Sequence, residues 1–456
     1  MSTLVLESPR LFDGQSLHRD MRVVVEDGRI ARVEPIAGTT PPGGEVETLR
    51  GAFLMPGLID CHLHIAGYVE GSPAGVPFKP VKDFLRLLIL NGITTARDTG
   101  NSIETIQYVR EWGERYAGPR VFASGPLLDV PPLVWPFSRI VREPAVARRQ
   151  VELLHLEGMD FIKSYRNVGP EVLAAIVETA RGFGMDVAAD VHGVSALEAC
   201  RLGVRSLEHA FNLFDQRALG LPDDEAFRGA QGRARVWHHF DPASREAEEM
   251  IAALLEHGTY VCPTLLVSHR WCDLEAMVHE PYLDYMVAVM PYHQYFKRMQ
   301  GAFGMAIGRR IMKDYLPVPK PSRVEKAEID DGLAKVRAFV GLLHRRGVPV
   351  VAGTDSPNPS IVPGFSLHQE MALMVEAGLS PLDVLVAATS RAASLLRQDD
   401  LGAVRPGCHA DLLLLDADPT EDIQSSRKIR AVVKAGRPVD LDHVHAKFQE
   451  SLTQRR

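Results

Sequence analysis

The chain has 456 residues, of which 46% are hydrophobic and 24% are charged, and its formal net charge is −7. This composition allows a large globular core and argues against nucleic acid or an anionic membrane surface as a partner. No apolar run reaches the roughly 18 residues that a membrane span needs, and the first residues show no signal-peptide pattern. Five scattered cysteines predict a reducing, cytoplasmic setting without a disulfide framework.

Both ends of the chain read as short strands joined by tight turns. In "MRVVVEDGRIARVEP", Asp27 and Gly28 form the turn of a predicted hairpin. A similar pattern near the other end places a second turn at Ala435 and Gly436. We therefore expect the two ends to pair into one small β-domain.

The centre of the chain alternates apolar strand candidates with helical patterns. Eight strand candidates occur along it, at residues 53–64, 94–100, 120–125, 161–165, 186–192, 206–210, 260–266 and 350–356. Several of the helical stretches between them end in glycine, which is the usual stop signal. Such alternation favours an α/β fold of the (β/α)8 TIM barrel type. The rival is an open doubly wound sheet, but no G-x-G-x-x-G follows the first strand.

The expected organisation has a composite β-sandwich domain from residues 1–54 and 400–440, an α/β barrel over 55–399, and a C-terminal tail over 441–456. Two stretches interrupt the barrel pattern. Residues 211–242 read as polar and loop-like, and residues 267–325 are rich in methionine and aromatic side chains. Both follow strand ends, where barrel enzymes build their sites. The second stretch is either a lid over the substrate or an oligomer contact.

Potential metal ligands follow the ends of several predicted strands. His62 and His64 are two residues apart, so they point to the same side of a strand, although such a pair is weak evidence alone. The further candidates are Lys163, Asp190, His192, His209 and Asp355. In a barrel all these strand ends meet at one mouth. A buried, unpaired lysine is costly, so a metal-linked role for Lys163 is favoured over a simple salt bridge.

These motifs resemble those of the metal-dependent amidohydrolase superfamily, in particular its prolidase-like branch. The resemblance rests on "PGLIDCHLH", "FIKSY", "GVRSLEHA", "AGTDS", "SLHQEMALMVEAGLSPLDVLVAATSRAASLL" and "LGAVRPGCHADLLLLD". It extends over nearly the whole chain, and the combination is much more specific than any single motif. The resemblance implies an enzyme that hydrolyses a carbon–nitrogen bond with a metal-bridging hydroxide.

The resemblance also implies roles for individual residues. His62 and His64 look like ligands of the more buried of two divalent metal ions, and His209 like a ligand of the second. Lys163 matches the lysine that CO2 converts to a carbamate, which bridges both metals. Asp355 matches the catalytic aspartate, which binds a metal and moves a proton to the leaving nitrogen. Zinc is the expected metal, although nitrogen and oxygen ligands also suit cobalt, manganese or nickel.

One position departs from the pattern of the family. In "GMDVAADVHG", Asp190 stands where relatives usually place the histidine of strand five, and His192 follows two residues later. Either His192 becomes the ligand after a small shift, or Asp190 binds through oxygen and His192 contacts the substrate. We favour His192, and the alternative leaves the identity of the second metal open.

The expected mouth of the barrel is apolar and aromatic. Trp135 lies near strand three, and the resemblance places Tyr165, Arg166 and Tyr260 where related enzymes hold their substrate. This favours a bulky hydrophobic or aromatic small molecule with an amide or peptide-like bond. The alternatives are a phenylurea or (thio)carbamate xenobiotic hydrolase on the same scaffold, and a metal-free binding or scaffold protein. The resemblance also implies a homo-oligomer.

Overall fold

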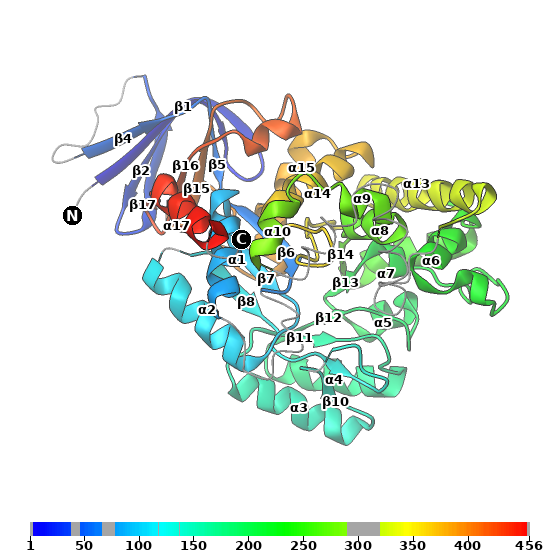
Figure 1. Cartoon of the computed structure of the whole chain (residues 1–456). Coiled ribbons are helices and arrows are strands. Elements are labelled where there is room, and N and C mark those ends of the chain that lie inside the picture. The colour runs from blue at the N-terminus through cyan, green and yellow to red at the C-terminus, as the bar shows by residue number, and fades with distance from the viewer. Residues whose placement is uncertain are drawn as a thin grey trace.

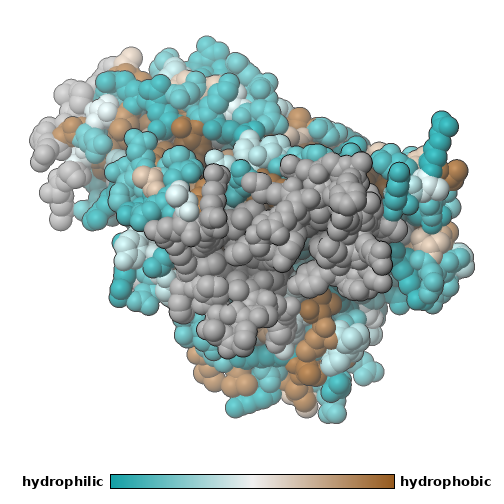
Figure 2. Space-filling view, viewed as in Figure 1, coloured by the Kyte–Doolittle hydropathy of each residue, from teal (hydrophilic) through white to brown (hydrophobic). Residues whose placement is uncertain are grey.

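The computed structural model describes residues 3–37, 46–65, 78–116, 118–135, 137–289 and 320–453. A sheet at one end of the molecule adjoins a larger part in which helices surround curled strands (Figure 1). On the face seen in Figure 2, the described surface is mostly hydrophilic, with smaller hydrophobic areas. The described helices are all too short or too polar to cross a membrane.

Strands from both ends of the chain lie in one eight-stranded sheet, in the order β17-β16-β15-β5-β1-β2-β3 with β4 beside β1. They are β1 (Thr3–Phe12), β2 (Leu17–Glu26), β3 (Arg29–Pro35), β4 (Val46–Arg50), β5 (Phe53–Pro56), β15 (Leu412–Leu415), β16 (Ile429–Lys434) and β17 (Arg437–Pro438). Both predicted hairpins are confirmed, because Asp27-Gly28 joins β2 to β3 and Ala435-Gly436 joins β16 to β17. All four turn residues have positive φ, as type I′ turns require.

The central strands are parallel and form two hydrogen-bonded groups, β6-β7-β8 and β10-β9-β11-β12-β13-β14. They are β6 (Leu58–Leu63), β7 (Ile93–Asp98), β8 (Arg120–Ala123), β9 (Leu128–Asp129), β10 (Arg139–Ile140), β11 (Phe161–Ser164), β12 (Asp186–Ala189), β13 (Ser206–Glu208) and β14 (Tyr260–Cys262). The Asp160 backbone N–H donates to the Ala123 carbonyl at 2.9 Å and so links the two groups. Residues 349–356 hydrogen-bond to both β14 and β6, with isolated bridges in place of a regular strand.

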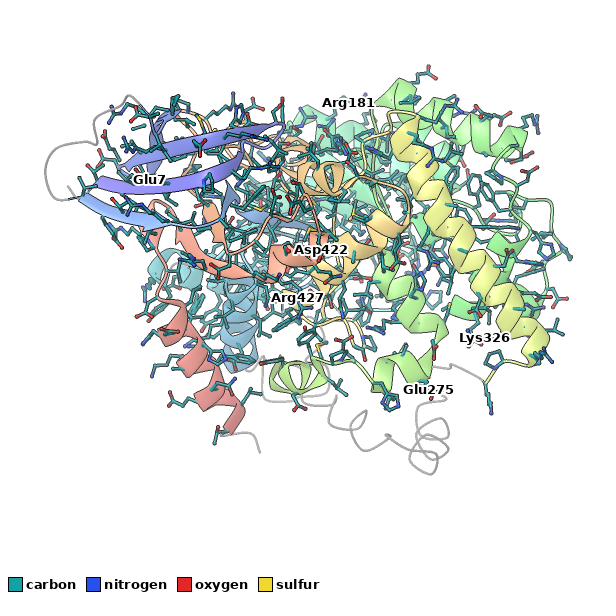
Figure 3. All side chains as sticks on the ribbon, turned by 90° about the horizontal axis from the view of Figure 1, so that it is seen from above. Glu7, Arg181, Glu275, Lys326, Asp422 and Arg427 are labelled. Carbon is teal, nitrogen blue, oxygen red and sulfur yellow. The ribbon has the colours of Figure 1, made fainter. Side chains whose placement is uncertain are left out.

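The helices are α1 (Phe78–Leu90), α2 (Ile103–Tyr116), α3 (Pro144–Leu156), α4 (Pro170–Gly182), α5 (Ala196–Leu202), α6 (Gly229–His238), α7 (Arg245–His257), α8 (Leu265–Cys272), α9 (Leu274–Val278), α10 (Leu283–Val289), α13 (Arg323–Arg345), α14 (Phe365–Glu376), α15 (Pro381–Ala387), α16 (Ser390–Leu395) and α17 (Leu441–Thr453). Serine side chains at 195, 244 and 322 accept backbone N–H groups and begin α5, α7 and α13. Gly203 and Gly258 follow α5 and α7 in the left-handed conformation that commonly ends helices. Figure 3 shows Glu7 in the end sheet and Lys326 in α13 on opposite sides of the molecule.

The predicted strand over 53–64 divides at Gly57 into β5 of the end sheet and β6 of the centre. A Cβ atom at Gly57 would lie 2.1 Å from the Oγ1 atom of Thr94, which is itself 1% exposed. The passage of the chain between the two sheets therefore requires glycine at this position.

Gly57→Ala is expected to lower the free energy of unfolding by about 1–3 kcal/mol, because the added methyl group overfills a closed contact. Urea unfolding measures the change. The matched control is Gly182→Ala at the end of α4, where the added methyl group would have no neighbouring atom within 4 Å. Equal stability of the two variants would show that the contact at Gly57 relaxes without cost.

Residues 211–242 were expected to be loop-like, and this expectation is wrong for part of the stretch. Helix α6 forms within it because Ala234, Val236 and Trp237 are buried. The Trp237 ring packs at 5.7 Å from the ring of Phe339 on α13. A mostly polar segment thus folds as a helix through contacts with a distant part of the chain.

The expected C-terminal tail over 441–456 contains helix α17. Its Phe448 is fully buried, and its Ser451 hydroxyl hydrogen-bonds to Asp83 of α1. In the stretch 267–325, residues 290–319 lie outside the described part of the chain. The choice between a lid and an oligomer contact therefore stays a prediction.

Candidate active site

One cavity brings together side chains from the ends of four central strands, from the segment after β14 and from the segment that contains Asp355. Its wall includes His62, His64, Lys163, Asp190, His209 and Asp355. These residues are separated by up to about three hundred positions in sequence, and the parallel strands bring their ends to the same edge.

The two histidines at the end of β6 direct their Nε2 atoms at one carboxylate. His62 Nδ1 lies 2.7 Å from Glu208 Oε2 and must donate, so its Nε2 lone pair faces Asp355 Oδ1 at 3.5 Å. His64 Nδ1 donates to the Gly100 carbonyl at 2.9 Å, and its Nε2 lies 3.2 Å from the same Asp355 oxygen. Facing acceptors repel unless a proton or a metal ion lies between them. This donor set therefore fits a cation.

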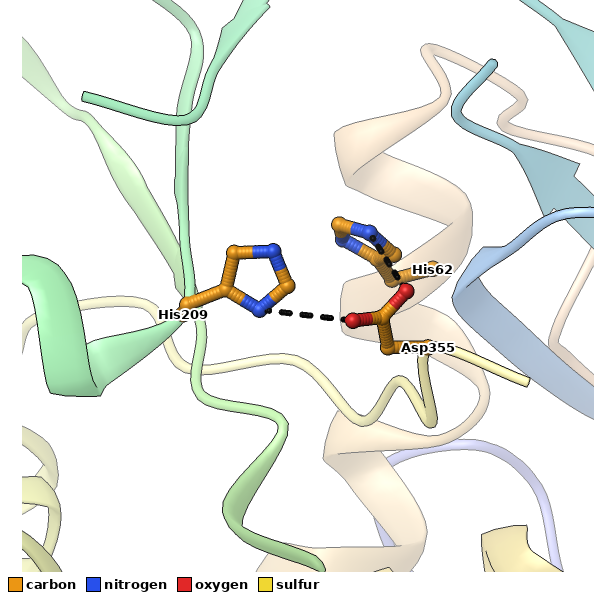
Figure 4. Close-up of side chains that lie close together, drawn as sticks. All are labelled: His62, His209 and Asp355. Atoms are coloured by element: carbon orange, nitrogen blue, oxygen red, sulfur yellow. Dashed lines mark ion pairs between the residues drawn. The ribbon is translucent and has the colours of Figure 1, made fainter. Parts of the chain in front are cut away.

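His209 completes the group from the opposite strand, as Figure 4 shows. One ligand atom each of His62, His209 and Asp355 can be chosen so that all three lie within 4.8 Å of one another. His209 and Asp355 have φ of 66° and 62°, and Thr264, whose hydroxyl is 2.7 Å from His209 Nδ1, has φ of 46°. Such backbone conformations are costly for these residues and concentrate at functional sites.

Lys163 is a buried amine in the wall of this cavity. Its side chain is 1% exposed, and its Nζ has no hydrogen-bond partner among the described residues. Burial lowers the pKa of Lys163 below the ordinary value, because the ammonium form loses its hydration. An orphaned amine beside converging imidazoles and carboxylates fits conversion to a carbamate ligand better than it fits a structural cation.

Sequence reasoning missed the charged network beneath His62. Glu208 is 1% exposed, and its second oxygen accepts from Arg97 at 2.9 Å and from Ser206 at 2.5 Å. Burial alone would raise the pKa of Glu208, but the positive charge of Arg97 holds it well below its usual range. An ionised Glu208 fixes the protonation of His62 at Nδ1. The signal in the sequence was a charged residue inside the strand motif "SLEHA".

The structure places Asp190, and not His192, in the wall of this cavity. Asp190 Oδ2 lies 3.9 Å from His209 Nε2. His192 lines a neighbouring hollow instead, and its Nε2 accepts a hydrogen bond from Arg233 at 3.1 Å, which engages the lone pair of that nitrogen. The preference for His192 as ligand does not match this placement. The reason is that β12 ends at Ala189, so strand alternation no longer governs the next residues.

Asp190→Ala is accordingly expected to weaken metal binding by about 10-fold to 100-fold, whereas His192→Ala changes it by less than about threefold. Competition with a chromogenic chelator measures both affinities on the purified variants. A larger loss in His192→Ala than in Asp190→Ala would restore His192 as the ligand.

The four predicted substrate residues divide into two groups. Trp135, Tyr165 and Arg166 line the cavity, and Trp135 Nε1 donates to the Tyr165 hydroxyl at 3.0 Å. Tyr260 is the first residue of β14, at the opposite end of the strand, where the Arg205 guanidinium lies 4.6 Å from its ring centre. Tyr260 therefore does not reach this cavity. Trp271, from the aromatic stretch 267–325, lies in this wall as expected, and Phe211, which sequence reasoning missed, adds to it.

Imidazoles and carboxylates gathered at the ends of parallel strands, with a buried lysine amine, are typical of hydrolases that build a metal site on an α/β scaffold. The model of the Amidohydrolase family matches residues 53–439. The chain belongs to the amidohydrolase family and is thus a hydrolase that acts on carbon–nitrogen bonds.

Comparisons with single proteins agree with this assignment. Ochratoxinase from Aspergillus niger is 25% identical over 476 aligned positions, which cover 92% of this chain and 82% of the relative. A solved Xaa-Pro dipeptidase with bound methionine has a TM-score of 0.66 and 20% identity, covering 96% of this chain and 99% of its own. Molinate hydrolase has a TM-score of 0.62 and 19% identity, covering 97% and 95%. Prolidase-like and ochratoxinase-like amidohydrolases thus share this fold.

Proposed function

We propose that the protein is a binuclear, metal-dependent amidohydrolase that cleaves an amide or peptide-like bond of a bulky hydrophobic or aromatic small molecule. The observation that carries this proposal is the convergence of His62, His209 and Asp355 around one point, with the orphaned amine of Lys163 in the same cavity. The aromatic side chains of Trp135 and Trp271 in the opposite wall support an apolar substrate.

In this proposal His62, His64, His209 and Asp355 would hold two divalent metals, with zinc as the expected ion and Lys163 as a CO2-derived carbamate. The metals supply an activated water molecule and polarise the scissile carbonyl. The remaining chemistry belongs to the protein.

Asp355 is placed to accept the proton of the attacking water and to pass it to the leaving nitrogen. Its backbone N–H donates to the His62 carbonyl at 2.7 Å, which fixes the position of the carboxylate. Burial alone would raise the pKa of Asp355, but the hydrogen bond from His64 and the neighbouring imidazoles lower it to about 2. The carboxylate is therefore ionised and ready to accept a proton at neutral pH. The aromatic wall limits the access of bulk water.

Metal removal tests the proposal. Treatment with 1,10-phenanthroline is expected to lower the hydrolysis of N-acyl amino acids or dipeptides by about 10²-fold or more, and Zn²⁺, Co²⁺ or Mn²⁺ is expected to restore it. If the protein hydrolysed only phenylureas or thiocarbamates, the proposed amide substrate would be wrong and the alternative class of substrate would take its place. A purified protein that binds no metal and hydrolyses none of these compounds would be a binding or scaffold protein, and the proposal would fail.

We also propose that the central strands close into a barrel and that the two ends of the chain form one domain. The links between the two groups of parallel strands and residues 349–356 support a closed (β/α)8 barrel over 55–399, and the shared end sheet supports a composite β-domain. We further propose a cytoplasmic homo-oligomer, as the family resemblance implies, and light scattering of the purified protein tests its assembly.

A further inference from the structure

A hollow of about 600 Å³ lies where α2 and β8 meet the turn between β16 and β17. Among the described residues of its wall, every charged side chain is basic: Arg110, Arg115, Arg120, Lys434 and Arg437. We call this space the basic hollow. Positive charges gathered around one space repel each other and attract anions, so the first question is how far nearby carboxylates balance them.

Two of these cations are neutralised by carboxylates outside the wall. Arg110 forms an ion pair with Asp160, and Arg115 Nη2 lies 2.8 Å from Glu111 Oε1 one helical turn away. These pairs leave the other three cations of the basic hollow to be balanced.

The other three cations have a single carboxylate between them. Lys434 Nζ lies 2.6 Å from Asp411 Oδ2, and Arg120 Nη2 lies 3.6 Å from the same oxygen. Arg437 is exposed and forms no ion pair with a described carboxylate. Three cations beside one carboxylate leave an excess of two positive charges at this wall.

Arg120 also has hydrogen-bonding capacity to spare. Its Nε atom is buried without a hydrogen-bond partner among the described residues, and the 3.6 Å contact of its Nη2 with Asp411 is too long for a hydrogen bond. The side chain is 33% exposed, so it is accessible from the hollow. A guanidinium with unused donors beside a space is suited to the oxygens of a phosphate group.

We propose that the basic hollow is a binding site for a phosphate-bearing small molecule, whose oxygens contact Arg120 and Arg437. A phosphate group brings a charge of about −2 and several acceptor oxygens, which matches the excess charge and the unused donors. A single carboxylate would balance only half of that charge.

This site is separate from the catalytic cavity. Arg120 is the first residue of β8, which runs parallel to β7 and β6. The basic hollow therefore lies at the amino ends of these strands, whereas His62 and His64 lie at the carboxyl end of β6. The inference does not depend on the proposed function, because binding here can be measured whatever reaction the protein catalyses.

A neighbouring hollow could hold the remainder of such a molecule. It shares Gly118 with the basic hollow, and Trp112 and Tyr116 line it. The Tyr116 side chain is 62% exposed, and its ring centre lies 5.3 Å from that of Trp112. An exposed aromatic ring beside a phosphate site offers a stacking surface to a base. The phosphate could thus belong to a nucleotide or to a free polyphosphate, and the experiment distinguishes the two sources.

The test is calorimetry of the purified protein with pyrophosphate, ATP and adenosine. We expect saturable binding of both phosphate compounds, which weakens as salt is added, and no binding of adenosine. Arg120→Met is expected to weaken phosphate binding by about 10-fold or more, and Arg437→Met by about 3-fold to 10-fold. Both variants should fold, because Asp411 keeps Lys434 as a partner and Arg437 is exposed.

Arg32→Met is the matched control, because it removes an equal charge from β3 of the same sheet, from a 48% exposed side chain outside this wall. It is expected to leave both affinities within about twofold. The site would be overturned if the parent protein bound neither phosphate compound, or if Arg32→Met lost as much affinity as Arg437→Met. Binding that persists in both other variants but disappears with 1,10-phenanthroline would belong to the proposed metal site and would also overturn it.

Tyr116→Ala separates the two sources of phosphate. Tighter binding of ATP than of pyrophosphate, with the difference removed in Tyr116→Ala, would support the site and identify a nucleotide. Equal affinities that Tyr116→Ala leaves unchanged would support the site for a free polyphosphate. Adenosine binding as tight as that of ATP would show that the aromatic rings and not the cations hold the ligand, and the phosphate site would be rejected.

Discussion

Replacing Lys163 by methionine is expected to abolish binding of the metal pair and to lower kcat/KM by about 10²-fold or more. Methionine matches the length of the lysine stem but cannot form a carbamate. Metal content by mass spectrometry and intact mass under non-acidic conditions are the measurements, and the parent protein is expected to show the additional mass of one CO2. The effect is large because the buried Lys163 amine has no hydrogen-bond partner among the described residues.

The same substitution is expected to stabilise the metal-free protein by about 1–3 kcal/mol in urea, because it removes a buried amine that has no compensating interaction. Lost function together with gained stability is the result expected if the Lys163 amine serves the metal site and destabilises the metal-free protein. A structural lysine would give the opposite sign.

Lys434→Met provides the matched control at a second buried lysine. Lys434 Nζ lies 2.6 Å from Asp411 Oδ2, and both side chains are 6% exposed. Removing Lys434 leaves Asp411 with Arg120 at 3.6 Å as its remaining cation, so a loss of about 3 kcal/mol is expected with unchanged metal content. If Lys163→Met kept its metal or lost stability like Lys434→Met, Lys163 would be a structural cation.

The sequence predicted the site where local periodicity continues to the functional residue. His62 and His64 lie at the end of β6, and the two-residue repeat of a strand correctly turned both toward the cavity. Cys61 between them packs on the other face, against Cys262 and Val351. In a regular strand, side chains alternate between the two faces up to the last residue. The prediction therefore holds for His62 within β6 and for His64 directly after it.

The two-residue repeat of a strand gave the wrong direction for side chains that lie beyond the end of β12. The run "DVAADVH" continues to His192, but the hydrogen-bonded strand β12 stops at Ala189. Beyond that point the chain turns, Asp190 enters the cavity and His192 faces α6. A short apolar run cannot show where its hydrogen bonds end, because that depends on the neighbouring strand. Tyr260 was misplaced for a related reason, since a motif identifies a strand but not which of its ends a residue occupies.

Contacts between distant segments were the least accessible from the sequence. Arg233 reaches the cavity because α6 packs on α13, where the Cβ position of Gly332 would lie 1.8 Å from the Ala234 carbonyl oxygen. Nothing in the local pattern of the polar stretch 211–242 encodes this close crossing. Arg233 was therefore not recognisable from the sequence as a residue of the cavity wall.

Asp355→Asn is expected to reduce kcat by about 10²-fold to 10⁴-fold while the protein stays folded. The amide keeps the shape of the carboxylate but cannot accept the proton of the attacking water, and it gives up the negative charge that faces His62 and His64. The backbone hydrogen bond from Asp355 to His62 does not involve the side chain, so the position of the residue is retained. Steady-state kinetics and the thermal midpoint are the paired measurements.

Asp355→Glu separates the loss of the base from the loss of its position. The glutamate retains a proton acceptor but moves it by one methylene, so activity is expected to lie between that of the parent protein and that of Asp355→Asn. A solvent isotope effect on kcat that is present in the parent protein and reduced in Asp355→Asn would place the carboxylate in the proton-transfer step. Asp355→Asn activity within about tenfold of the parent protein would exclude this role, because general-base catalysis contributes at least about 10²-fold. The convergence of two imidazole nitrogens on Asp355 would then describe metal binding alone, with the proton carried by another group.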